Sequence, residues 1–177
     1  MVNQNIKKFT VVSLFTAFAI ILSYIEFLIP FIIGIQGFKL GLSNIATVYC
    51  LYMLGEKECV IITLIRILVI NLLFGTIFSL MFSISGGIIS CITMILLKRL
   101  MKSGIIFTSA IGGVVHNIAQ IIIAFFIIES SVIFGLMPVL TIVGMITGLV
   151  VGIVSEQIYK RTYQYIKTMF RKENIQW

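Results

Sequence analysis

The few polar side chains inside the apolar stretches of this sequence are the groups that could do chemistry. His116 and Gln120 are four residues apart in one stretch, so a helix would present both on one face. Arg66 lies in the middle of another stretch, where a guanidinium needs a carboxylate, backbone carbonyls or an anionic ligand. Glu26 is a candidate carboxylate and would make a structural ion pair. Lys39 would then remain as a cation that favours anionic ligands.

His116 is the only histidine of the chain and allows two interpretations. It is either a hydrogen-bond partner between helices, or a contact to a ligand, including a single axial bond to a metal. One histidine does not build a zinc site, and no acidic residue or cysteine is spaced to help it. Cys50, Cys59 and Cys91 form no CxxC pair, and we interpret them as small apolar packing residues.

The residues that are missing exclude several kinds of catalysis. The chain contains no aspartate, which excludes the Asp-rich magnesium–diphosphate motif of prenyl-transfer enzymes and an Asp-bearing triad. It also contains no GxxxxGK[ST] loop, so it does not hydrolyse ATP by the usual P-loop. An enzyme would have to combine His116 with Glu26 or Arg66, for which there is no recognisable geometry. We therefore expect a protein that is not an enzyme and has no intrinsic cofactor.

Composition indicates where these polar groups are held. The chain is 60% hydrophobic and 11% charged, whereas soluble domains carry roughly a quarter charged residues. We expect one integral membrane domain over residues 1–177. The net charge of +7 belongs at the ends of the membrane spans, so no nucleic acid partner is expected.

The apolar runs predict an all-α, polytopic membrane bundle of six transmembrane helices. The expected spans are approximately residues 9–29, 39–55, 59–74, 76–97, 105–128 and 138–159. Residues 30–41 are interrupted by one proline and three glycines, which favours a loop packed against the protein. The Glu56-Lys57-Glu58 stretch is expected to be a charged turn, and a basic tail ends the chain.

Charge distribution predicts the orientation of this bundle. Eleven of the thirteen basic residues fall on one side, one on the other, and Arg66 within a span. The positive-inside rule makes the basic side cytoplasmic. The protein is thus expected in the cell membrane, multi-pass, with both termini in the cytoplasm. The basic-side residues are Lys7, Lys8, Lys57, Lys98, Arg99, Lys102, Lys160, Arg161, Lys167, Arg171 and Lys172.

This topology brings most of the polar groups to the outer half of the bundle, beneath loop 30–41. Such a pattern suits a binding cavity that opens to the outside and is covered by a loop. Hydroxyls of the fourth span either add to the cavity or bond back to their own helix. The candidate ligand-binding residues are Glu26, Lys39, Asn44, Arg66, Asn71, His116, Asn117 and Gln120.

Small residues recur at a spacing of four in two spans. Gly144, Gly148 and Gly152 form one stripe, and Ser13 and Ala17 share a face of the first span. Such residues let a neighbouring helix approach closely. They serve either ordinary packing within the membrane or the docking of a partner subunit.

Several stretches, in order, resemble one membrane family. They read AIILSYIEFLIP, FKLGLSNIATVYCLYMLG, ITLIRILVINLLFGTIFSLMFSISGG and GGVVHNIAQIIIAFF, and the resemblance covers about residues 8–158. The family is labelled the Gx transporter family or heptaprenyl diphosphate synthase component I. It is similar to the substrate-binding S-components of energy-coupling factor (ECF) transporters, which are six-helix bundles with an outward-facing site capped by the first loop.

The resemblance implies partners and a ligand. S-components work with a transmembrane coupling subunit and two cytosolic ATPases, and Ser13 and Ala17 would lie on the coupling-subunit face, although they depart from the usual Ala-xxx-Ala pattern. Some members are linked to haem uptake, and others sit beside electron-transfer or quinone genes. Haem would place its propionates on Arg66 or Lys39 and its iron on His116, and a flavin would fit almost as well.

The leading hypothesis is therefore an S-component-like subunit that captures a small apolar and anionic compound from outside, with haem as first candidate. The synthase label reflects gene neighbourhood rather than catalysis, because aspartate is absent. The alternative is a non-catalytic membrane partner of a prenyl-diphosphate synthase or of an extracellular electron-transfer system.

Overall fold

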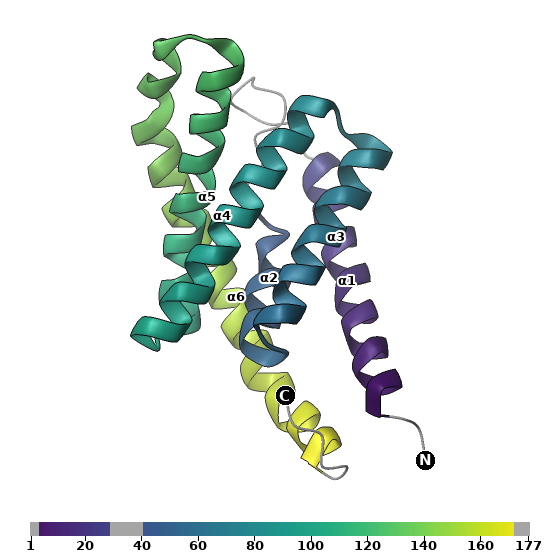
Figure 1. The fold of residues 1–177 in the computed structure, drawn as a ribbon. Coiled ribbons are helices and arrows are strands. Elements are labelled where there is room, and N and C mark those ends of the chain that lie inside the picture. The colour runs from purple at the N-terminus through teal and green to yellow at the C-terminus, as the bar shows by residue number, and fades with distance from the viewer. Residues whose placement is uncertain (1–3, 29–40, 172–177) are drawn as a thin grey trace.

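The computed structural model describes residues 4–28 and 41–171, and every regular element in these residues is a helix (Figure 1). The all-α prediction is therefore confirmed. The elements are α1 (Gln4–Leu28), α2 (Asn44–Met53), α3 (Glu56–Phe74), α4 (Ile77–Met101), α5 (Ile105–Ile128), the short 3-10 helix η1 (Ser131–Leu136) and α6 (Met137–Arg171).

Four of the described segments are long and apolar enough to cross a membrane. They are Lys8–Leu28, Ile77–Met101, Ile105–Ile128 and Ser131–Tyr165. Helix α3 has sufficient length at 19 residues but carries four charged side chains. Helix α2 has 10 residues, a length of about 15 Å that does not cross the apolar core by itself. The protein is a helical membrane bundle, and the number of six crossings stays a prediction.

Helix α2 is shorter than the predicted second span and lies in the middle of the bundle. It contacts α1, α3, α4, α5 and α6. Seven of its ten residues are buried, from Asn44 to Leu51. A helix buried on all sides needs no polar face, which is why its sequence has so little amphipathic pattern. The start of α2 is thereby fixed inside the bundle, next to α1 and α3.

The stretch predicted as a charged turn is the first turn of α3, so that prediction is wrong. Gly55 precedes it with a φ of +122°, a conformation that favours glycine, and reverses the chain there. Glu56 and Glu58 then lie in the first turn, where negative charge stabilises the positive end of the helix dipole.

Helices α4 and α6 both extend further than predicted. Lys98 and Arg99 form part of the last turn of α4 rather than its end, because basic side chains stabilise the C-terminus of a helix. The helix ends where Lys102 adopts a left-handed conformation with φ of 47°. The expected basic tail continues α6 to Arg171, and η1 was not predicted from the sequence.

The glycine stripe of α6 packs within the chain, against α5, on which α6 packs most extensively of all its neighbours. A Cβ atom at Gly148 would lie 2.6 Å from the carbonyl oxygen of Ser109 and 2.9 Å from the Cα of Ala110. Both are backbone atoms, so the helices approach this closely only because the side chain is absent. Of the two interpretations of this stripe, the structure supports packing.

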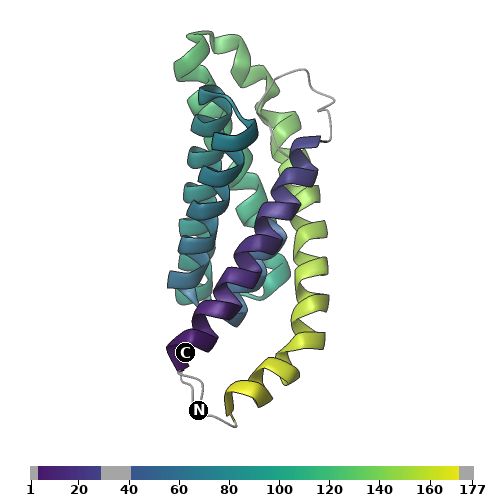
Figure 2. The ribbon, with the colours of Figure 1, turned by 90° about the vertical axis from the view of Figure 1, so that its right-hand side faces the viewer.

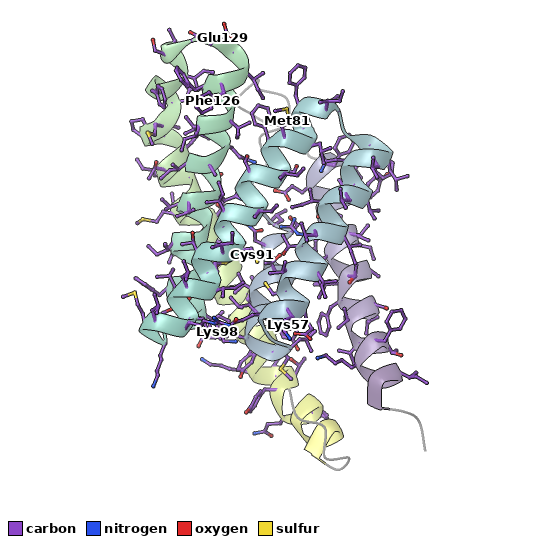
Figure 3. The ribbon with its side chains drawn as sticks, in the orientation of Figure 1. Lys57, Met81, Cys91, Lys98, Phe126 and Glu129 are labelled. Carbon is purple, nitrogen blue, oxygen red and sulfur yellow. The ribbon has the colours of Figure 1, made fainter. Side chains whose placement is uncertain are left out.

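The outer surfaces of the bundle suit a lipid environment. Helices run side by side along the long axis (Figure 2), and large apolar side chains such as Leu72 and Ile77 are more than three-quarters exposed. Lys57 and Lys98 lie at the end where α1 begins, and Glu129 lies at the opposite end (Figure 3). The bundle thus has an apolar surface and one basic end.

Candidate ligand-binding site

Glu26, near the end of α1, reaches across to the start of α2. Its Oε1 accepts a hydrogen bond from the backbone N–H of Gly41. Its Oε2 accepts from the hydroxyl of Ser43 at 3.2 Å and lies 3.5 Å from the backbone nitrogen of the same residue. Ser43 is the N-cap residue of α2 and Gly41 lies two residues before it, so the carboxylate lies at the helix N-terminus, where the helix dipole favours an anion. Glu26, only 4% exposed, therefore acts as the anion that caps α2.

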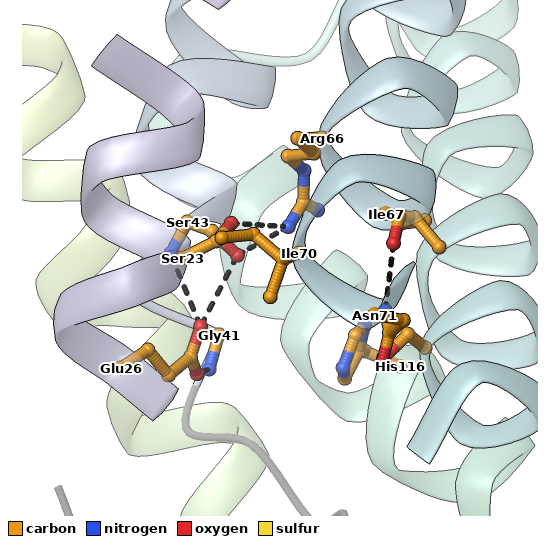
Figure 4. Close-up of a pocket in the computed structure, with 10 residues that line it drawn as sticks. Ser23, Glu26, Gly41, Ser43, Arg66, Ile67, Ile70, Asn71 and His116 are labelled. Carbon is orange, nitrogen blue, oxygen red and sulfur yellow. Dashed lines mark hydrogen bonds between the residues drawn. The ribbon is translucent and has the colours of Figure 1, made fainter. Parts of the chain in front are cut away.

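Arg66 approaches the same point from α3, and it is 5% exposed. Its Nη1 donates to the Ser43 hydroxyl, and its Nη2 donates to Oδ1 of Asn44 at 2.9 Å. Ser43 therefore connects the guanidinium to the carboxylate of Glu26, as Figure 4 shows. Ser23 on α1 adds a weaker contact at 3.5 Å. The cluster thus stabilises Arg66 by a hydroxyl bridge rather than by the direct ion pair that was one prediction.

A small cavity of about 20 Å³ lies beside this cluster. Its walls include Glu26 of α1, Arg66 and Asn71 of α3, and His116 of α5, so side chains from three helices meet there (Figure 4). A polar cavity of this volume holds about one water molecule. The described part of the site therefore has no space for an organic ligand. The other lining residues are Ser23, Gly41, Ser43, Ile67, Ile70 and Ser83.

His116 and Gln120 lie together on α5, as their spacing predicted. Nε2 of Gln120 is 3.2 Å from Nε2 of His116, and both side chains are buried. The Oε1 atom of Gln120 and the Nε atom of Arg66 have no hydrogen-bond partner among the described residues. Buried polar atoms without partners are uncommon in folded proteins and often mark the place of a water or a ligand.

Asn71 and Asn117 bond within the bundle. Asn71 donates to the carbonyl of Ile67 and accepts from the hydroxyl of Ser79, which joins α3 to α4. It also lines the cavity, as predicted. Asn117 donates to the carbonyl of Leu140 on α6 at 2.8 Å. Because adjacent residues of a helix point about 100° apart, Asn117 faces α6 while His116 faces the cavity.

Most of the predicted ligand-binding residues lie together, and some residues of the site were missed. Lys39 lies outside the described residues. Ser43 and Ser23 were not predicted, although both positions could have been found. Ser43 directly precedes Asn44, and Ser23 is one helical turn before Glu26 on the same face of α1.

Ser13 and Ala17, predicted to contact a partner, are exposed on α1. They line an open groove of about 670 Å³ that also includes Ile61 and Ile65 of α3. Lys8 and Glu58 form an ion pair of 2.6 Å at the groove. The groove is therefore mostly apolar and is open on the side of the bundle where α1 meets α3.

Comparison with protein families gives a match that covers almost the whole bundle. No curated protein matches the chain, and no solved structure matches it. The family model of heptaprenyl diphosphate synthase component I matches residues 15–158, a range that includes every described residue of the cavity. The similarity to ECF S-components stays a prediction. The chain belongs to the heptaprenyl diphosphate synthase component I family.

Proposed function

We propose that the protein is the substrate-binding, S-component-like membrane subunit of an ECF-type importer, and that it captures a small anionic and largely apolar compound from outside. The observation that carries this proposal is the convergence of buried polar side chains from α1, α3, α4 and α5, and from Ser43 just before α2, on one cavity. Polar groups inside a membrane bundle are costly and usually serve a ligand or an ion pathway.

The anion preference of the site follows from its donors. The turn that leads into α2 donates directly to the carboxylate of Glu26, and the guanidinium of Arg66 is linked to the same carboxylate through the Ser43 hydroxyl. A carboxylate of a ligand could occupy the same place, because it offers the same acceptors. Glu26 is thus an internal substitute for the ligand anion, and its displacement frees the end of α1.

Movement of α1 is required for capture. The cavity of about 20 Å³ admits a water molecule and no organic compound. Helix α1 contacts α2 and α3 but packs less tightly than the glycine-lined pair of α5 and α6. Release of Glu26 from α2 would therefore open the bundle on the side of α1 and leave the other helices in place.

Haem is the first ligand to test, with its propionates on Arg66 and its iron on His116. The purified protein in detergent is titrated with haemin, and the Soret band is recorded. We expect a shifted Soret band that is lost in His116→Ala and weakened in Arg66→Gln. Gln157→Ala, at an exposed position of α6, is the matched control and should bind like the native protein. An unshifted band, or one that His116→Ala leaves unchanged, rejects haem.

The importer role has its own test, which does not depend on the ligand. Co-purification from cells should recover a transmembrane coupling subunit and two ATPase subunits. Ala17→Trp would fill the groove between α1 and α3 and should abolish this recovery. Ile142→Trp, on the exposed face of α6, should retain it. If both variants lost the partner subunits, or if both retained them, docking at the groove would be contradicted.

A second candidate function is that of a non-catalytic membrane component that works with a soluble prenyl-diphosphate synthase. The name of the family favours it, and the absence of aspartate from the sequence agrees with a component without catalysis. In the co-purification experiment, recovery of a prenyl synthase without ATPase subunits would support this candidate and reject the importer.

A further inference from the structure

Two cysteines of neighbouring helices lie side by side in the core. Cys59, in α3, and Cys91, in α4, have Sγ atoms 3.5 Å apart. Both are free thiols, with 0% and 2% of their surface exposed. The ligand-binding role does not use them, and they are far apart in the sequence, so the fold alone brings them together.

We propose that Cys59 and Cys91 form an oxidisable dithiol, which a lipid-soluble two-electron acceptor converts into a disulfide joining α3 to α4. A disulfide requires the two sulfurs, now 3.5 Å apart, to approach to about 2.0 Å. The helices are already close, because a Cβ atom at Gly87, one turn from Cys91, would lie 2.6 Å from Cδ1 of Ile67.

The surroundings of the pair favour oxidation over metal binding. Among the described residues no group of three histidine, cysteine or acidic side chains could hold a metal ion, whereas a structural zinc needs four ligands. The two thiols belong to one core cluster of buried apolar residues that includes Val48, Leu51 and Met94, and Sγ of Cys59 also lies 3.5 Å from the carbonyl oxygen of Thr47. Such surroundings exclude water and charged reagents, so the oxidant has to be small and uncharged.

The third cysteine is not an equal partner. Cys50 lies in α2 and belongs to a different core cluster, with Tyr49 and Leu54.

Helices α3 and α4 are also joined at a second point, where the Ser79 hydroxyl donates to Oδ1 of Asn71 at 2.8 Å. A disulfide would therefore connect two helices that already pack along their length.

The oxidation can be performed with diamide, an uncharged diazene. One thiol adds its sulfur to the N=N bond and its proton to the other nitrogen. The second sulfur then attacks the first, so that the S–S bond forms as the S–N bond breaks. The released nitrogen takes the second proton, and the diazene leaves as a hydrazine. Two electrons and two protons thus pass from the dithiol to the oxidant.

The experiment counts thiols in the full-length protein. The protein in detergent is reduced, treated with diamide, denatured in SDS and labelled with a polyethylene glycol maleimide. We expect the number of labels to fall from three to one in the native protein, and from two to zero in Cys50→Ala. Reduction after the treatment should restore every label. Cys59→Ala and Cys91→Ala should keep both of their remaining thiols.

Mass spectrometry identifies the linked residues and keeps the test valid if a variant folds poorly. The native protein should yield a peptide pair that joins Cys59 to Cys91 and has lost two hydrogen atoms. Retention of all three thiols, a disulfide that contains Cys50, or a crosslinked dimer on a non-reducing gel would each overturn the proposal.

Discussion

The connection between Glu26 and Arg66 through Ser43 makes a quantitative prediction about stability. Replacing Glu26 by Gln keeps the size of the side chain and removes its charge. The guanidinium of Arg66, 5% exposed, then keeps its hydroxyl and amide acceptors but loses its counter-charge. The N-terminus of α2 loses its anion at the same time.

The magnitude follows from the burial of both groups. Removing one member of a buried, hydrogen-bonded charge pair costs about 3–5 kcal/mol. In a protein of this size, each 1 kcal/mol lowers Tm by about 2–4 °C, so Glu26→Gln should lower Tm by roughly 6–12 °C at the lower end of that cost. Arg66→Met should cost a similar amount, because it leaves Glu26 as an isolated buried carboxylate.

The double variant decides whether the two groups are coupled. Once Arg66 is absent, the charge of Glu26 no longer stabilises a buried guanidinium. The free-energy costs of the two single substitutions should therefore not add. We expect a coupling free energy of about 2 kcal/mol, within the range measured for neighbouring groups.

The stability of the native protein, the two single variants and the double variant can be measured through the chain's own cysteines. All three are buried and free in the folded protein, so a fluorogenic maleimide reports their exposure as the temperature rises. Additive costs, within about 0.5 kcal/mol, would show that Glu26 and Arg66 act independently and would refute the bridge through Ser43.

Two further predictions concern other parts of the bundle. Gly148→Ala should destabilise the protein by about 1–3 kcal/mol, because its Cβ would lie 2.6 Å from a backbone oxygen of α5, whereas Gly135→Ala, with open space around it, should leave Tm unchanged. The hydrogen bond from Arg99 lowers the pKa of Glu56, so this pair stabilises the fold above the unfolded pKa of Glu56, about 4.3, and the contribution disappears as the pH falls through the lower folded value. Tm should therefore be slightly higher for the native protein than for Glu56→Gln at pH 7, and the difference should vanish in acid.

Much of the site could be predicted because a charge inside an apolar run is informative wherever it occurs. Glu26, Arg66 and His116 stand out for that reason, and all three line the cavity. Asn117 looked similar, yet it faces α6. Neighbouring helix residues point about 100° apart, and here this rotation places His116 at the cavity and Asn117 against α6.

The central position of α2 could not be predicted in the same way. Hydropathy identifies apolar segments but does not distinguish a helix surrounded by lipid from one surrounded by protein. The surroundings of Ser43 depend on this difference, because the residue connects two charges only when α1 and α3 both flank the start of α2. Long-range packing decided that arrangement, and one sequence contains little record of it.

The two roles of Glu26 can be separated by the direction of their effects. If Glu26 only caps α2, then Glu26→Gln weakens the fold and, with it, any binding of an anion. If its carboxylate occupies the place of a ligand anion, as the proposed function requires, the same substitution removes an internal competitor. The variant should then be less stable alone, yet bind haemin more tightly and gain more Tm from it than the native protein does, since ligand binding stabilises the folded state by mass action. A loss of stability together with weaker binding would leave Glu26 as a helix cap and would remove the competition from the proposed mechanism.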